Sequence, residues 1–291
     1  MLCFRSLPVI GLIAAGALAG CKSDRSAGGT GTSPATATEP PKAAPSTMTV
    51  TATDYRFDAP ATAPAGAVTI HLINQGKELH QVELIKLEDG KTVADMTKAL
   101  QTPGPPPSWI KFVGGPNGVV TGQEAYATSV LAPGNYAFLC FIPSPDGVMH
   151  AAKGMVRPFE VTAASGALTE APAADVTITL TDYAFHSSQP LTAGRHTIMV
   201  KNAGPQPHEI VLLKLAPGKK TEDFGKWAET GMKGPPPAQP IGGVAYLDKG
   251  SEGSFTADLT AGDYGFICFL PDAKDGKPHL AHGMMKTVTV N

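Results

Sequence analysis

The chain has 291 residues, a formal net charge of −2 at pH 7 and only 16% charged residues. A near-neutral composition lacks the basic excess that attracts phosphate backbones, so we expect no nucleic-acid partner. The 32 glycines and 27 prolines indicate many turns between short elements. The length is sufficient for two domains of ordinary size after an N-terminal leader.

The N-terminus predicts export. Residues 1–20 contain Arg5 and an apolar run too short to span a membrane, which is typical of a signal peptide. The run ends in LAGC, which resembles a bacterial lipobox and implies cleavage before Cys21 and lipid attachment to it. An ordinary signal peptide that happens to contain a cysteine is the alternative. Lys22 favours the outer over the inner membrane, so we expect a lipoprotein of the bacterial cell envelope that faces the periplasm.

The remaining chain divides into four parts. Residues 21–46 carry almost nothing to bury and predict a disordered tether. Residues 47–162 and 175–291 predict two domains, and residues 163–174 predict the linker between them.

The two predicted domains contain the same residues in the same order. Four positions of the first recur 128 positions later, and two more recur 129 positions later after a one-residue insertion. Register kept over the length of a domain indicates two copies of one unit. The recurring pairs are Asn74 and Asn202, Gly76 and Gly204, His80 and His208, Cys140 and Cys268, His150 and His279, and Met155 and Met284.

Alternating residues predict half-buried strands in both copies. The copies open with MTVTATDYRF and VTITLTDYAF, and further alternating segments follow between glycine turns. Residues 92–101 and 221–233 are the candidate helices, and each is stopped by a GPPP segment, because proline lacks the amide donor. The pattern predicts an all-β protein with two tandem antiparallel β-sandwiches, each carrying one short helix.

The recurring His, Cys, His and Met predict a metal site in each copy. A lone histidine, cysteine or methionine is more often a packing residue, but four such residues recurring together favour ligands. Each domain keeps one cysteine, which is no disulfide framework. Two imidazoles, one thiolate and a weak axial thioether form the ligand set of blue copper, in which soft sulfur favours Cu(I) and imidazole also accommodates Cu(II).

Both copies resemble cupredoxins, the plastocyanin and azurin superfamily, from the tether to the C-terminus. The motif is an early histidine in N-x-G-x-x-x-H and a late Cys, His and Met cluster. The resemblance implies Greek-key sandwiches and two type 1 copper sites, one per domain. The spacing between Cys and the late His is nine or ten residues, which resembles nitrite reductases more than small electron carriers. The implied ligands are His80, Cys140, His150 and Met155, and His208, Cys268, His279 and Met284.

Four neighbours are predicted to support these ligands. Asn74 and Asn202 are expected to shape the turn before the early histidine. Gln81 and Glu209 follow that histidine, where hydrogen bonds in cupredoxins often reach the thiolate. A Gln in one copy and a Glu in the other predicts that the two copper sites have unequal reduction potentials. The second copy also offers His282 and Met285, which alignment with the first copy marks as bystanders.

The resemblance implies a copper-binding electron-transfer protein with exported redox proteins, such as cytochromes or copper enzymes, as transient partners. Nitrite reductases and multicopper oxidases carry a histidine beside the blue-copper cysteine, whereas Leu139, Phe141, Ile267 and Phe269 stand there in this chain. We therefore expect that the chain is not an enzyme. Two alternatives remain: periplasmic copper binding, buffering or delivery without electron transfer, and a structural or interaction protein with degenerate sites.

Overall fold

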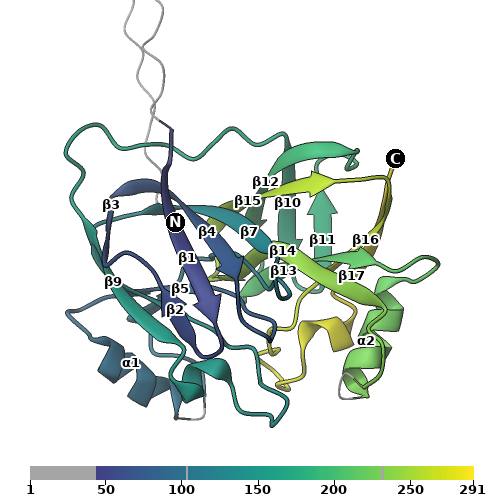
Figure 1. The fold of residues 1–291 in the computed structure, drawn as a ribbon, viewed down its shortest axis with the longest axis horizontal. Helices are drawn as coiled ribbons and strands as arrows, with labels where there is room; N and C mark the ends of the chain where they lie inside the picture. Colours follow the sequence, from purple (N-terminus) through teal and green to yellow (C-terminus); the bar gives the residue numbers. More distant parts are fainter. Residues whose placement is uncertain (1–43, 103, 231–232) are drawn as a thin grey trace, which may run out of the picture. The chain divides into compact units, whose positions relative to one another are not determined.

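The computed structural model describes residues 44–102, 104–230 and 233–291 (Figure 1). The predicted signal peptide, Cys21 and the tether up to residue 43 lie outside the described residues. Lys42–Asn291 forms one compact unit. The described part is built from strands and two α-helices, as the all-β prediction requires. Within it, no helix is long and apolar enough to cross a bilayer.

The first repeat contains two facing sheets. One has the order β2-β1-β4-β7 and the other β3-β9-β8-β5-β6. Buried side chains from both sheets, such as Leu72 and Phe138, form the core between them. The strands are β1 (Ser46–Thr53), β2 (Arg56–Asp58), β3 (Thr62–Pro64), β4 (Gly66–Asn74), β5 (Glu83–Leu87), β6 (Ile110–Phe112), β7 (Glu124–Leu131), β8 (Gly134–Leu139) and β9 (Val156–Thr162).

The second repeat has the same arrangement. Its sheets have the orders β11-β10-β12-β15 and β14-β13-β16-β17, with Val200 and Phe266 in the core between them. The strands are β10 (Val176–Thr181), β11 (Ala184–Ser187), β12 (Gly194–Asn202), β13 (His208–Leu215), β14 (Ala238–Leu247), β15 (Glu252–Leu259), β16 (Gly262–Ile267) and β17 (Met285–Val290).

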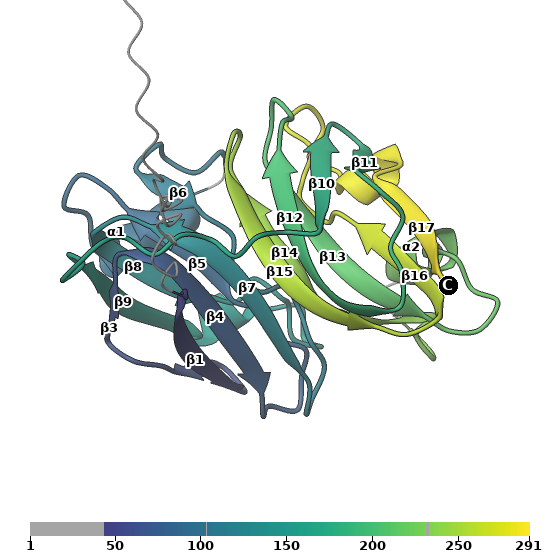
Figure 2. The same cartoon turned by 90° about the horizontal axis from the view of Figure 1, so that it is seen from above.

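One sheet runs through both repeats. Strand β7 pairs with β15 in antiparallel register, with Thr128 opposite Ser254, so the eight strands from β11 to β2 are continuous (Figure 2). A second contact runs beside it: the segment from Phe112 to Gly118 exchanges backbone hydrogen bonds with residues 242–248. The two repeats therefore share a backbone-paired junction, and the boundaries at 47–162 and 175–291 stay predictions.

The sheets are mixed, which differs from the purely antiparallel expectation. Strand β1 pairs with β4, β10 with β12, and β3 with β9 in parallel. Between β1 and β4 the chain enters β3, which belongs to the opposite sheet, and then returns. A crossover of this kind brings two strands together in the same direction. The Greek-key order stays a prediction.

Both predicted helices are present. Helix α1 (Val93–Leu100) begins after Thr92, whose side chain accepts from the Asp95 amide while the Asp95 carboxylate accepts from the Thr92 amide. Helix α2 (Thr221–Glu229) ends earlier than the predicted residue 233 and is capped at Thr230.

Glycine is required at one point where two strands of the second repeat, β13 and β14, approach each other closely. Gly243 has φ of 116°, and a Cβ atom there would lie 2.0 Å from the Ile210 carbonyl oxygen. Gly250 also has positive φ, 79°, but a Cβ atom there would meet nothing within 4 Å. Gly250 therefore has only the left-handed backbone conformation, whereas Gly243 has both that conformation and a close neighbouring backbone.

We expect Gly243→Ala to lower the free energy of unfolding by more than Gly250→Ala does. The control should lose only the cost of the left-handed conformation, about 1–2 kcal/mol. Gly243→Ala adds displacement of the β13 backbone at Ile210. Urea unfolding of both variants measures the difference, and equal losses would contradict a close backbone approach at Gly243.

Candidate metal centres

The structure brings the first set of predicted ligands together from three parts of the fold. His80 lies in the loop between β4 and β5, Cys140 directly follows β8, and His150 opens the short 3-10 helix η1 (His150–Lys153). The Ala151 amide donates to the Cys140 carbonyl at 2.8 Å, and the Met155 amide donates to the His150 carbonyl at 2.9 Å. These backbone bonds fix the late loop against the end of β8.

The donor atoms of the first set face one another. His80 Nδ1 lies 3.1 Å from His150 Nδ1, and Cys140 Sγ lies 3.4 Å from the same His150 nitrogen. All three side chains are fully buried, and Met155 is buried in the same core cluster as Cys140. The first copy therefore places a His, Cys, His group in one buried position.

The second copy repeats this geometry. His208 Nδ1 lies 3.1 Å from His279 Nδ1, and Cys268 Sγ lies 3.3 Å from His279 Nδ1. Met284 is buried with Cys268, and its amide donates to the His279 carbonyl at 3.0 Å. His279 opens the short 3-10 helix η2 (His279–His282). Met285 packs against the α2 side of the sheet instead.

The spacing of the donors fits a metal ion. With bonds of ~2.0 Å to nitrogen and ~2.3 Å to sulfur, donors about 100–120° apart lie roughly 3.1–3.7 Å from one another. The distances in both groups fall within this range. Two imidazole nitrogens that face each other so closely need a proton or a cation between them. Each group of His, Cys and His is therefore able to hold a copper ion.

Burial favours the neutral, ligating form of the histidines. It lowers the pKa of His80 and of His208, and it lowers the pKa of His279 to about 4. Neutral imidazole is the form that binds a metal ion. The buried nitrogens are thus available as ligands at neutral pH without first losing a proton to solvent.

The thiols are stabilised as ligands by backbone amides. Burial raises the pKa of Cys140 to about 11, and hydrogen bonds from the Gln81 and Ile142 amides oppose this. Burial also raises the pKa of Cys268, opposed by the Glu209 amide. Gln81 and Glu209 thus reach the sulfur through their backbone N–H groups. The contact with the sulfur therefore does not depend on which of the two side chains follows the early histidine.

The two asparagines shape the turns before the early histidines. Asn74 Nδ2 donates to the carbonyls of Glu78 and Val119 at 2.8 Å each, and its Oδ1 accepts from the Gly76 amide at 2.9 Å. Asn202 makes the corresponding bonds in the second copy. Asn74 therefore ties the turn to the segment that pairs with His80.

Two carboxylates that were not predicted hold the early histidines from outside. Asp54 Oδ1 lies 3.3 Å from His80 Nε2, and Asp182 Oδ1 lies 2.9 Å from His208 Nε2. A carboxylate behind a ligating imidazole fixes the ring and raises its basicity. The signal was present in the sequence, because TDY recurs at residues 53–55 and 181–183 in the same 128-residue register.

The tyrosine of each TDY segment also faces the site. Tyr55 and Tyr183 both have φ of 66°, a conformation that costs a non-glycine residue energy and occurs often at functional sites. The Tyr55 hydroxyl donates to Glu78 Oε1 at 2.8 Å, and its ring meets the His150 ring edge-on at 5.3 Å. The strained turn thus places both an aspartate and a tyrosine at the centre.

The late histidines are held differently in the two copies. His150 Nε2 is hydrogen-bonded to Glu78 Oε2 at 2.8 Å. In the second copy Gln206 replaces Glu78, and Asp272, at the position of Ser144, supplies the carboxylate, 3.9 Å from His279 Nε2. The carboxylate has therefore moved from the early turn to the late loop, and its contact with the imidazole is looser.

Glu209 connects the second centre to the first repeat. Its side chain is 4% exposed, and Oε1 accepts from the amide of Phe269, the residue after Cys268, at 2.9 Å. Oε2 accepts from Asn117 Nδ2 at 2.9 Å. Asn117 lies two residues before Val119, which exchanges backbone hydrogen bonds with His80. A short run of bonds thus joins His208, through its neighbour Glu209, to His80.

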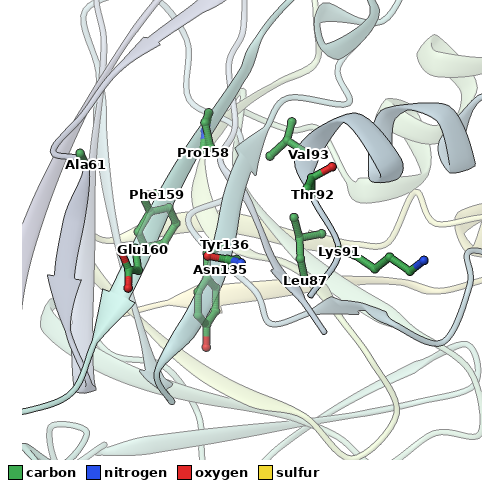
Figure 3. Close-up of a pocket in the computed structure, with 10 residues that line it drawn as sticks. All are labelled: Ala61, Leu87, Lys91, Thr92, Val93, Asn135, Tyr136, Pro158, Phe159 and Glu160. Carbon is green, nitrogen blue, oxygen red and sulfur yellow. The ribbon is translucent and has the colours of Figure 1, made fainter. Parts of the chain in front are cut away.

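A surface pocket of about 370 Å³ lies elsewhere on the first repeat (Figure 3). It is formed beside the start of α1 by residues of β5, β8 and β9, with Tyr136 and Phe159 in its wall. None of the predicted ligands lines it. The described centres are therefore buried donor groups and not part of this pocket.

No protein-family model and no curated protein matches the chain. Among solved structures, auracyanin from Roseiflexus castenholzii is 22% identical with a TM-score of 0.30, over 41% of this chain and 99% of that one. A blue copper oxidase from Nitrosomonas europaea is 13% identical with a TM-score of 0.25, over 85% of this chain and 86% of that one. A copper nitrite reductase from the same organism is 14% identical with a TM-score of 0.24, over 85% of this chain and 94% of that one.

The two buried His, Cys, His groups and the mostly β fold agree with the sequence prediction. The chain resembles the cupredoxins. The expectation that it is not an enzyme is corrected, because the solved structures that match over 85% of its length include an oxidase and a reductase. These likenesses are too distant to assign a reaction or a substrate.

We expect Asp54→Asn to weaken Cu(II) binding by the first repeat about 10–100-fold, because the His80 ring loses the carboxylate that orients it. Asp58→Asn, in β2 and away from the histidines, is the matched control. Competition titration with a copper chelator measures both affinities. Unchanged affinity in Asp54→Asn would show that Asp54 does not support the ligand.

Proposed function

We propose that the protein is an exported copper protein that transfers electrons through one type 1 copper centre in each repeat. The observation that carries the proposal is the presence of two complete sets of buried His, Cys, His and Met in the same register. A single set of buried His, Cys, His and Met is compatible with a structural protein that binds no metal. Two complete sets with matching donor spacing favour a retained metal function.

The proposed ligands are His80, Cys140, His150 and Met155 in the first repeat, and His208, Cys268, His279 and Met284 in the second. Copper bound there supplies one-electron redox chemistry. The chain contributes rigidity: carboxylates hold the imidazoles from outside, and backbone amides point at the sulfurs. Donors fixed in this way change little between two oxidation states, which favours fast electron transfer.

The location and partners belong to the same proposal. The LAGC segment supports lipid attachment at Cys21, and the polar residues after it support a tether to a membrane that faces the periplasm, with the outer membrane favoured by Lys22. Exported redox proteins, such as cytochromes or copper enzymes, would be transient partners. A tether of about 25 residues spans an r.m.s. distance of roughly 25–30 Å, enough for such encounters.

Copper binding, buffering or delivery without electron transfer is the second candidate. One observation favours it: His150 and His279 are fully buried, so neither late histidine offers an exposed ring edge to a partner. The two functions differ in the optical properties and redox behaviour of the bound copper.

Reconstitution with Cu(II) tests the proposal. We expect about two coppers per chain and an intense thiolate-to-copper charge-transfer band that a mild reductant bleaches. Cys140→Ser and Cys268→Ser should each remove one of two bands and leave the other repeat intact. Copper bound without the band would favour the buffering role, and failure to bind copper would reject both functions.

The two centres are expected to have unequal reduction potentials. Glu209 stands where the first copy has Gln81, and the carboxylates behind the late histidines lie at different distances. Redox titration of Cys140→Ser and Cys268→Ser measures each potential separately. Glu209→Gln makes the copies alike at one of these positions and should narrow the gap, and identical potentials in the parent variants would contradict the hypothesis.

A further inference from the structure

A polar contact between the repeats begins beside the second centre. Glu209 Oε1 accepts from the Phe269 amide at 2.9 Å, and Phe269 directly follows Cys268. Glu209 Oε2 accepts from Asn117 Nδ2, also at 2.9 Å, and Asn117 belongs to the first repeat. The carboxylate therefore connects the residue next to a proposed copper ligand with the other repeat.

The contact continues from Asn117 to His80. Asn117 Oδ1 accepts from the Gly118 amide at 2.7 Å, and the following residue is Val119. The Val119 amide donates to the His80 carbonyl at 3.0 Å, and the His80 amide donates to the Val119 carbonyl at 3.3 Å. A continuous path of covalent bonds and hydrogen bonds thus runs from Cys268 of the second centre to His80 of the first.

The two side chains that meet between the repeats are removed from solvent. Asn117 is 2% exposed and Glu209 is 4% exposed. Burial of a carboxylate costs folding free energy, and apolar residues in place of both partners of a buried hydrogen bond are often neutral or stabilising. Stability alone therefore does not explain why an acid and an amide meet at this point.

Both residues depart from the repeat. Gln81 stands in the first copy at the position of Glu209, and Ala245 stands in the second copy at the position of Asn117, each 128 residues away. Alanine has no polar side chain, so Gln81 has no counterpart of Asn117 to meet. The contact therefore forms once, between the cysteine side of the second centre and the early histidine of the first.

We propose that the contact between Glu209 and Asn117 carries electrons between the two copper centres, so that the chain transfers electrons internally as well as to partners. This inference rests on the proposed function. One electron leaves Cu(I) in one repeat, which becomes Cu(II), and enters Cu(II) in the other, which becomes Cu(I). Covalent and hydrogen bonds couple redox centres more strongly than a gap between atoms does, so loss of the contact slows this step.

Pulse radiolysis of the copper-loaded full chain tests the path. Every chain carries Met284→Gln, because a harder axial ligand favours Cu(II) and makes the second centre differ from the first in spectrum and potential. After partial reduction we expect a phase in which the second centre is oxidised while the first is reduced. Its rate should not depend on protein concentration, since the electron stays within one chain.

The expected effect of Asn117→Leu is a several-fold slower internal phase with both copper bands retained. Ser129→Ala is the matched control and should leave the rate unchanged. Ser129 is also buried at the junction, but its hydroxyl donates to the Val113 carbonyl. If Asn117→Leu fails to fold, Asn117→Ser replaces it, because the serine side chain is too short to hold Glu209.

A second measurement uses the metal-free chain. Urea unfolding of Asn117→Leu, Glu209→Gln and the double variant forms a double-mutant cycle. We expect the double variant to lose less free energy of unfolding than the sum of the two single losses, because either change alone removes the contact. Additive losses would show that the two side chains do not interact and would overturn the proposal.

The outcomes separate this inference from the proposed function. Two copper bands without an internal phase, or with a phase that Asn117→Leu leaves unchanged, would overturn the electron path and leave the proposed function standing. Failure to form either band would reject the proposed function and the electron path with it.

Discussion

In each repeat two histidine Nδ1 atoms face each other at 3.1 Å beside a buried cysteine sulfur. Three donors removed from water in so small a space are unfavourable unless a proton or an ion lies between them. The other contacts of each site hold these three donors in place. Backbone amides point at the sulfur, and Asp54 or Asp182 holds the early imidazole by its other nitrogen. The sulfur is therefore held by backbone amides, and the early imidazole is held by a carboxylate on the nitrogen that faces away from the other donors.

The junction between the repeats is built around the same residues. Glu209 is fully enclosed and joins the Phe269 amide to Asn117 of the first repeat, while Glu83 of the first repeat approaches the Tyr246 amide at 3.4 Å. Burial raises the pKa of Glu83, and the nearby Glu209 raises it further. Two buried acids at the junction make the repeats interdependent at a point close to both centres. The difference between Gln81 and Glu209 thus acts at the junction and at the Phe269 amide, next to Cys268.

The ligand set was predictable from the sequence because its members recur in register, and their identities carry their chemistry. Asp54 and Tyr55 were predictable in principle, since TDY recurs in the same register, but an isolated aspartate at a strand end has many ordinary roles. The carboxylate behind the late histidine could not be predicted from the sequence, because it changes position between the copies, from Glu78 to Asp272. Pairing of β7 with β15 depends on which sheet edges meet in space. The alternation of apolar and polar residues along a strand does not show which sheet edges meet, and it does not show that β1 pairs with β4 in parallel.

X-ray absorption at the copper edge of the copper-loaded chain tests the central claim most directly, because it reports the atoms bound to the metal. We expect one thiolate sulfur and two imidazole nitrogens around each of two coppers. A spectrum with nitrogen and oxygen neighbours only would contradict it, since copper would then be bound outside the buried Cys and His groups.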